Sequence, residues 1–97
     1  MITGKQRASL RALAHGLTPI VIIGKDGLND GVIDSIRDGL YARELIKIRL
    51  LNSCELSTRD VSNKVCEMLG CEAVQCIGSI LVIYKKSNKP NIEHIEF

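Results

Sequence analysis

Two glycines flank a lysine and an aspartate in the segment Gly24-Lys25-Asp26-Gly27, which joins an apolar run to a segment of helical periodicity. Glycine lets backbone N–H groups approach a ligand closely and permits a positive φ. A helix that starts after such a loop directs free N–H groups and a partial positive charge toward an anion. Lys25 adds a full positive charge. These residue types at this spacing favour the binding of phosphate.

A tight strand-to-helix turn with a solvated lysine explains the same four residues, because the Gly-x-x-Gly pattern is short. Two longer phosphate motifs are excluded. A P-loop needs a longer glycine loop that ends in Lys-Ser or Lys-Thr, and a dinucleotide-binding turn needs a third glycine. Neither pattern is present. The choice therefore depends on what surrounds the loop.

Positive charge is concentrated before the loop and within it. The net charge is only +2, yet residues 1–25 contain no acid. The bases of this stretch are Lys5, Arg7, Arg11 and Lys25. A concentrated positive region attracts an anionic partner even when the total charge is small. The alternative for the first three is a helix face that is merely solvated. Lys47, on the polar side of a later strand, could join the same surface or pair with a glutamate.

The sequence contains no recognisable pattern of catalytic residues. His15 has no nucleophile or carboxylate beside it in the sequence, and no pair of acids forms a catalytic pattern at a glycine-rich turn. Asp30, Asp34 and Asp38 could hold a divalent ion, but aspartates at four-residue spacing on a helix usually face water. We therefore predict no catalytic residue, no metal or other cofactor, no small-molecule substrate and no enzymatic activity.

The four cysteines are Cys54, Cys66, Cys71 and Cys76. The spacing Cys66-x4-Cys71-x4-Cys76 differs from the paired Cys-x2-Cys of a zinc site. The cysteines lie in apolar patterns, so we expect them to be buried and reduced. A redox or metal role is the alternative.

No segment predicts membrane insertion or export. The longest apolar run, residues 20–23, is far shorter than the roughly 20 residues that span a bilayer. The N-terminus has no apolar core of the signal-peptide kind. We expect a cytoplasmic protein.

Seven elements are predicted to position these residues. Hydrophobic periodicity indicates helices over residues 3–17 and 29–43, and a third from a capping box at Ser57 to Gly70. Apolar runs and alternation indicate strands over residues 19–23, 44–51, 73–77 and 80–84. The first strand does not alternate, which is typical of a central strand covered on both faces.

The order α-β-α-β-α-β-β defines an α/β fold with a mixed four-stranded sheet and packed helices. Two strand-helix-strand units predict parallel pairings, and a hairpin turn at Gly78-Ser79 predicts an antiparallel one. We expect residues 1–86 to form one domain and residues 87–97 to form a polar, loosely ordered tail.

Three stretches taken together resemble the CRM domain family, in its stand-alone bacterial YhbY-type form. They run from Lys5 to His15, from Pro19 to Leu28 and from Glu44 to Ile48, and the hairpin from Ile77 to Tyr84 also matches. The resemblance covers about residues 2–86. It implies a fold like the C-terminal domain of the third translation initiation factor.

The resemblance also implies RNA binding through the GxxG loop, and an association with precursors of the large ribosomal subunit in an assembly role. Carried over to this chain, it assigns RNA contact to Gly24, Lys25, Asp26, Gly27, Lys5, Arg7, Arg11 and Lys47. Asp26 departs from the family, because a neutral residue would suit phosphate better. We expect a monomer that binds ribosomal RNA or precursor particles. The alternative is a protein-interaction scaffold that docks on ribosomal or translation proteins without touching RNA.

Overall fold

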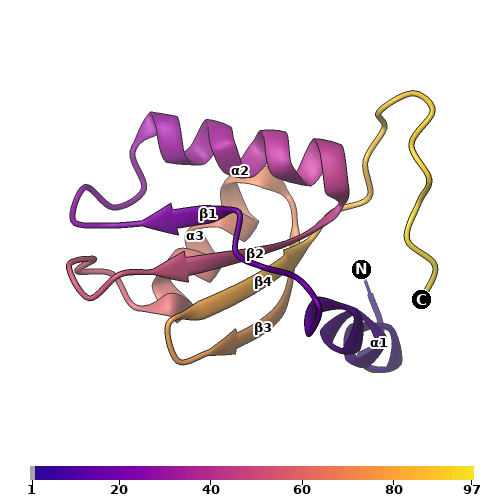
Figure 1. The fold of residues 1–97 in the computed structure, drawn as a ribbon, viewed down its shortest axis with the longest axis horizontal. Coiled ribbons are helices and arrows are strands. Elements are labelled where there is room, and N and C mark those ends of the chain that lie inside the picture. The colour runs from indigo at the N-terminus through magenta and orange to yellow at the C-terminus, as the bar shows by residue number, and fades with distance from the viewer. Residues whose placement is uncertain (1) are drawn as a thin grey trace.

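The structure is a computed structural model that describes residues 2–97 as three helices and a four-stranded sheet (Figure 1). In chain order the elements are α1 (Gly4–Ala14), β1 (Val21–Ile23), α2 (Asp30–Arg43), β2 (Leu45–Leu50), α3 (Thr58–Leu69), β3 (Glu72–Ile77) and β4 (Ile80–Tyr84). The predicted order and the α/β class are confirmed.

The strands lie in the order β1-β2-β4-β3. β1 pairs parallel with β2, and β4 pairs antiparallel with both β2 and β3. The first predicted parallel pairing and the hairpin are therefore confirmed. The second parallel pairing is wrong, because β4 inserts between β2 and β3 and takes up the hydrogen bonds of both.

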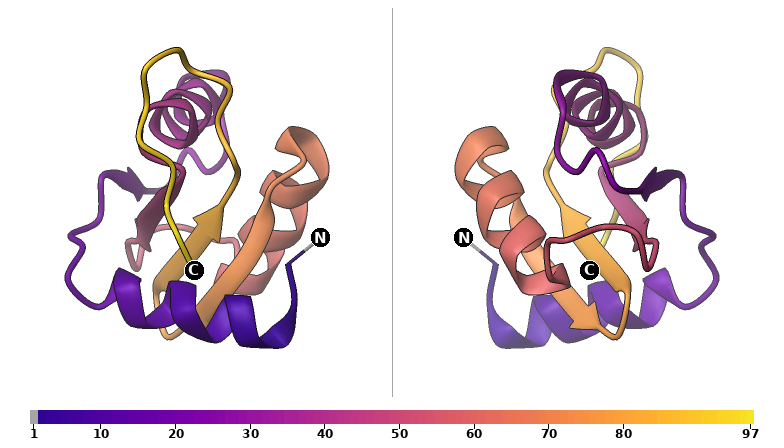
Figure 2. Two further views of the ribbon diagram at one scale, coloured as in Figure 1. Left: turned by 90° about the vertical axis from the view of Figure 1, so that its right-hand side faces the viewer. Right: turned by 90° about the vertical axis from the view of Figure 1, so that its left-hand side faces the viewer.

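The helices form two unequal layers. α2 and α3 cover one face of the sheet, while α1 alone lies on the other (Figure 2). The larger core lies under α2 and α3 and includes Ile36, Ile48 and Val65. A smaller core lies under α1, where Leu10 and Ala14 pack on the sheet. Because β2 alternates, its two sets of side chains belong to different layers.

Side-chain caps explain where the helices begin. Thr3 and Gln6 form a capping box at the start of α1, Asn29 caps α2, and Ser57 forms a capping box with Asp60 at the start of α3. Gly70 ends α3 with a φ of 66°, in the left-handed region that favours glycine. The predicted capping box of α3 is confirmed.

α1 is shorter than the sequence pattern predicts. It ends at Ala14, three residues before Leu17, because Gly16 and Pro19 prevent a further turn. Leu13 and Leu17, which helical periodicity places on one side of the predicted helix with Leu10 and Ala14, are 48% and 37% exposed. Only Leu10 and Ala14 of that side are buried.

β1 is an edge strand, so the prediction of a central strand covered on both faces is wrong. Val21 and Ile23 face the core, but Ile22 is 55% exposed because α1 does not reach it. β3 forms the opposite edge. Cys76 on β3 is exposed there, whereas it was expected to be buried. All four cysteines are free thiols.

Residues after Tyr84 contain no helix or strand, yet they are held in place by Glu44. This carboxylate is fully buried and accepts hydrogen bonds from the backbone N–H groups of Ser87 at 2.7 Å and Ile95 at 2.9 Å. Its Oε2 also lies 2.6 Å from His94 Nδ1. The sequence predicted a loosely ordered tail; in the structure, one buried carboxylate ties both of its ends to the domain.

Among residues 2–97, none of the helices combines the length and apolar character that a bilayer crossing requires.

Candidate functional site

The GxxG loop, residues 24–27, forms a β-turn at the end of β1. The backbone N–H of Gly27 donates to the carbonyl oxygen of Gly24 at 3.1 Å, so Lys25 and Asp26 occupy the two central positions. Both side chains are exposed. Gly27 has a φ of 62°, which favours glycine, but Gly24 is less constrained. A Cβ at Gly24 would lie 3.6 Å from Ser53 Oγ, an ordinary contact.

The N-terminus of α2 is a weaker binding site for an anion than the sequence suggests. α2 begins at Asp30, so two residues separate it from the GxxG loop. The side chain of Asn29 already accepts the N–H of Val32 at 2.9 Å. Asp30 adds a carboxylate to the first turn, where it competes with any bound anion. The positive character of this end of the molecule therefore comes mainly from Lys25.

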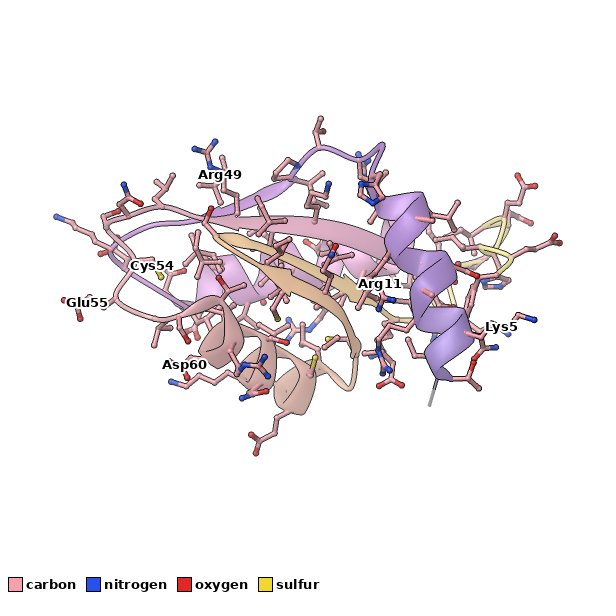
Figure 3. The ribbon with its side chains drawn as sticks, turned by 90° about the horizontal axis from the view of Figure 1, so that it is seen from below. Lys5, Arg11, Arg49, Cys54, Glu55 and Asp60 are labelled. Carbon is pink, nitrogen blue, oxygen red and sulfur yellow. The ribbon has the colours of Figure 1, made fainter. Side chains whose placement is uncertain are left out.

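The predicted basic side of α1 is divided among three different environments. Arg7 is half-buried, and its Nε donates to the carbonyl oxygen of Ala73 at 2.9 Å, which fastens α1 to β3. Arg11 is half-buried on the side of α1 that faces the uncovered strands (Figure 3). Lys5 is exposed on the opposite side of the helix (Figure 3). Of these three bases, Arg11 is the one directed over the sheet.

α1 crosses only one end of its sheet face. The remainder, which we call the open face, carries the side chains of Ile22, Lys47, Arg49, Ile77 and Ile80. Arg49 pairs with Ile22 on one side and with Ile80 on the other, so the open face is continuous across β1, β2 and β4. Lys47 is half-buried, and Arg49 is exposed.

Arg49 was not among the predicted contact residues. The signal that could have found it is the alternation of β2, which puts Arg49 on the same face as Lys47. It is the more accessible of the two, and it lies one strand away from the end of β1 that leads into the GxxG loop. The structure thus brings Lys47, Arg49 and Arg11 to one side of the sheet, while Lys25 is exposed in the loop that follows β1.

These bases are not neutralised by ion pairs. Within residues 2–97, the ion pairs are Arg37 with Asp34 and His94 with Glu44. Lys47 therefore does not pair with a glutamate, the alternative that the sequence left open. The exposed aspartates Asp30, Asp34 and Asp38 lie on α2, in the layer on the other side of the sheet. The three aspartates of α2 are therefore separated by the sheet from Lys47 and Arg49 on the open face.

Other candidate groups have structural explanations. Tyr84 is buried, and its ring contacts that of Phe97 edge-on with centroids 5.1 Å apart, so it packs against the tail. Burial, together with the charge of Glu44, raises the pKa of the Tyr84 hydroxyl. No group of three or more histidine, cysteine or acidic side chains that could hold a metal ion occurs in the described part of the chain.

The fold and the open face define a small α/β domain with one helix on one side of a mixed sheet and two on the other. The model of the CRS1 / YhbY (CRM) domain family matches residues 2–85, and the chain belongs to this family. The predicted family is thereby confirmed. The matched segment ends just before the tail that Glu44 anchors.

Relatives align over nearly the whole chain. The chain is 45% identical to the protein named Probable RNA-binding protein YqeI of Bacillus subtilis, over 92% of this chain and 93% of the relative. It is 34% identical to an RNA-binding protein of Haemophilus influenzae, over 95% of this chain and 93% of that one. The solution structure of a hypothetical protein from Staphylococcus aureus has a TM-score of 0.70 and 42% identity, covering 94% of this chain and 95% of the other.

Proposed function

We propose that this chain is an RNA-binding protein without enzymatic activity, and that it contacts the RNA backbone through the GxxG loop and the open face. Its membership of the CRM family and the names of its relatives support RNA as the partner. We further propose that it acts in the cytoplasm as a monomer, on precursors of the large ribosomal subunit.

The observation that carries this proposal is the grouping of three bases on one side of the sheet, next to the strand that leads into the GxxG loop. Lys47 and Arg49 on β2 and Arg11 on α1 border a sheet surface that α1 leaves uncovered, and exposed Lys25 lies in the loop that follows neighbouring β1. None of them forms an ion pair among the described residues. Unpaired cations in a shared field release counterions from RNA when they contact phosphates, which is a main source of affinity for nucleic acids.

The scarcity of aromatic side chains indicates how the protein contacts RNA. The chain has two tyrosines and one phenylalanine, and Tyr84 is buried against Phe97. A platform that stacks successive bases is therefore absent from the described open face. Binding should depend on phosphate contacts and on the shape of a structured RNA, and it should weaken steeply as salt rises.

The test is the salt dependence of binding to a structured fragment of large-subunit ribosomal RNA, measured by fluorescence anisotropy. Four phosphate contacts predict a slope of about −3 in a plot of log affinity against log salt concentration. A chain that shows no binding even at low salt would instead be the scaffold that docks on proteins, for which the exposed aspartates of α2 are the natural surface.

The contribution of the GxxG loop is tested by Lys25→Glu. Because Lys25 is exposed at a turn centre, the variant should keep its stability within about 0.5 kcal/mol. Its affinity for the same RNA should fall several-fold, since one phosphate contact becomes a repulsion. Equal affinities of variant and parent in a filter-binding assay would remove the loop from the proposed site.

A further inference from the structure

Two cysteines meet where α3 turns back into the sheet. Cys66 lies in the last turn of α3, and Cys71 follows Gly70 and precedes β3. The left-handed backbone of Gly70 reverses the chain, and its N–H donates to the carbonyl oxygen of Cys66 at 2.9 Å. This turn brings the two Sγ atoms within 3.5 Å of each other, with the Cys71 thiol donating to Cys66 Sγ.

The sulfur atoms are close enough to bond after a small movement. A disulfide has an S–S length of about 2.05 Å, so the two sulfurs need to approach by about 1.5 Å. Rotation about the side-chain bonds can supply a displacement of this size. Cys66 is half-buried and so reachable by a small reagent, whereas Cys71 is 5% exposed.

The surroundings give the two thiols unequal roles. The hydrogen bond from Cys71 lowers the pKa of the Cys66 thiol to about 7, with a further contribution from Ser62, against the opposing effects of burial and of the Glu72 carboxylate. The same hydrogen bond, followed by burial, raises the pKa of Cys71, although Lys85 nearby opposes this. At neutral pH a substantial fraction of Cys66 is therefore thiolate, the form that attacks an oxidant, while Cys71 keeps its proton.

We propose that Cys66 and Cys71 form an oxidation site that a small peroxide converts into an intramolecular disulfide. The Cys66 thiolate attacks one peroxide oxygen, the O–O bond breaks, and the hydroxide that leaves takes up a proton to become water. The product is a sulfenic acid on Cys66. Cys71 then loses its proton and attacks the Cys66 sulfur, the S–O bond breaks, and the departing hydroxide takes up a proton as a second water. Two thiols are oxidised by two electrons, and one peroxide is reduced to two waters.

The disulfide would fix the join between α3 and β3. On the far side of this join, Glu72 accepts the N–H of Ile2 at 2.8 Å, and Ala73 accepts the Arg7 side chain. The oxidised pair is therefore adjacent in the chain to the residues that hold the N-terminal segment and α1 on the sheet.

The test is to treat the whole chain with hydrogen peroxide near neutral pH and locate the linkage by mass spectrometry. A protease that cleaves after glutamate cuts at Glu67 and Glu72, which puts Cys66, Cys71 and Cys76 on three separate peptides. We expect a mass decrease of two hydrogen atoms and a linked pair that contains Cys66 and Cys71. In Cys71→Ser, the Cys66 sulfenic acid should persist and be captured by dimedone.

Cys76→Ser serves as the matched control, because it removes an exposed thiol outside the pair and should leave the linkage intact. The parent chain denatured in urea should lose the preference for the Cys66–Cys71 linkage. The proposal is overturned if exposed Cys76 is oxidised while Cys66 and Cys71 remain free thiols, or if the linked peptides contain Cys54 or Cys76 instead.

Discussion

The two glycines of the GxxG loop have different backbone requirements, although they look equivalent in the sequence. Gly27 has a φ of 62°, and this backbone conformation is strained for a residue with a Cβ. Gly24 has no such constraint, and a Cβ there would meet only ordinary contacts with Ser53 and Leu51. The fold requires glycine at one of these positions, while at the other glycine mainly keeps the backbone accessible.

Replacing each glycine with alanine should separate these roles. We expect Gly27→Ala to lower the free energy of unfolding by about 1–2 kcal/mol, because alanine is strained in the left-handed region. Gly24→Ala should change it by less than about 0.5 kcal/mol. Urea denaturation of both variants measures the difference, and equal losses would show that the backbone conformation of Gly27 is not what limits this position.

Arg7 and Arg11 also differ in a way that the sequence hides. Arg7→Ala should destabilise the fold by about 1 kcal/mol, since it removes the hydrogen bond from Arg7 Nε to the Ala73 carbonyl. Arg11→Ala should leave the free energy of unfolding within about 0.5 kcal/mol of the parent value and should instead weaken RNA binding. Thermal melts and RNA-binding curves of the two variants measure these effects. If Arg7→Ala melted at the same temperature as the parent chain, the structural role assigned to Arg7 would be wrong.

At the scale of elements, the tail is held by one buried carboxylate at the end of α2. Burial by itself would raise the pKa of Glu44, but hydrogen bonds from Ser87, Ile95 and His94 outweigh burial and hold the pKa below its ordinary value of 4.5. A carboxylate with a lowered pKa in the folded state contributes stability above its unfolded pKa, and this contribution is lost as pH falls through the folded value. The tail should therefore stay docked at neutral pH and be released only in acid.

NMR signals of the Ser87 and Ile95 amides can follow this release. Both should keep their positions at neutral pH and shift together at a pH below 4.5. Glu44→Gln should shift them at neutral pH, because the amide cannot accept all of the hydrogen bonds that the carboxylate accepts. Glu93→Gln is the control, since that residue is exposed in the tail itself. Tail amides that do not respond to Glu44→Gln would show that the tail is anchored by other contacts.

The elements themselves follow largely from local signals. Alternation in β2, the Asn29 cap, the Ser57 capping box and the turn at Gly78 all predict what the structure contains, because each depends on residues close in sequence. The position of β4 between β2 and β3 does not follow from such signals. The exposure of Ile22 was missed for the same reason, since it depends on which part of the sheet α1 covers.

Of the candidate site, the GxxG loop could be predicted from the sequence, but most of the open face could not. Lys25 is exposed where the sequence motif places it. Arg7 was expected on the contact surface, but its bond to Ala73 joins residues far apart in the chain and leaves no sequence pattern. Arg49 becomes conspicuous only once the open face is known. The anchoring of the tail by Glu44 likewise depends on distant partners.

At the scale of the whole molecule, the bases of the open face and the aspartates of α2 lie on opposite sides of the sheet. Lys47, Arg49 and Arg11 lie on the open-face side of the sheet, and the aspartates of α2 lie in the opposite layer. A local group of bases attracts a polyanion even though the net charge is only +2. For RNA binding by this domain, the position of a charge is therefore more important than the total charge.

The most direct test compares two reversals of equal charge on opposite sides of the sheet. In Arg49→Glu the changed residue lies on the open face. In Lys64→Glu it is an exposed residue of α3, in the layer on the other side of the sheet. Both change the net charge by the same amount. In anisotropy titrations of one large-subunit ribosomal RNA fragment at low salt, Arg49→Glu should weaken binding by about tenfold and Lys64→Glu by less than about twofold. Equal losses of affinity in the two variants, or no loss in Arg49→Glu, would contradict an RNA interface on the open face.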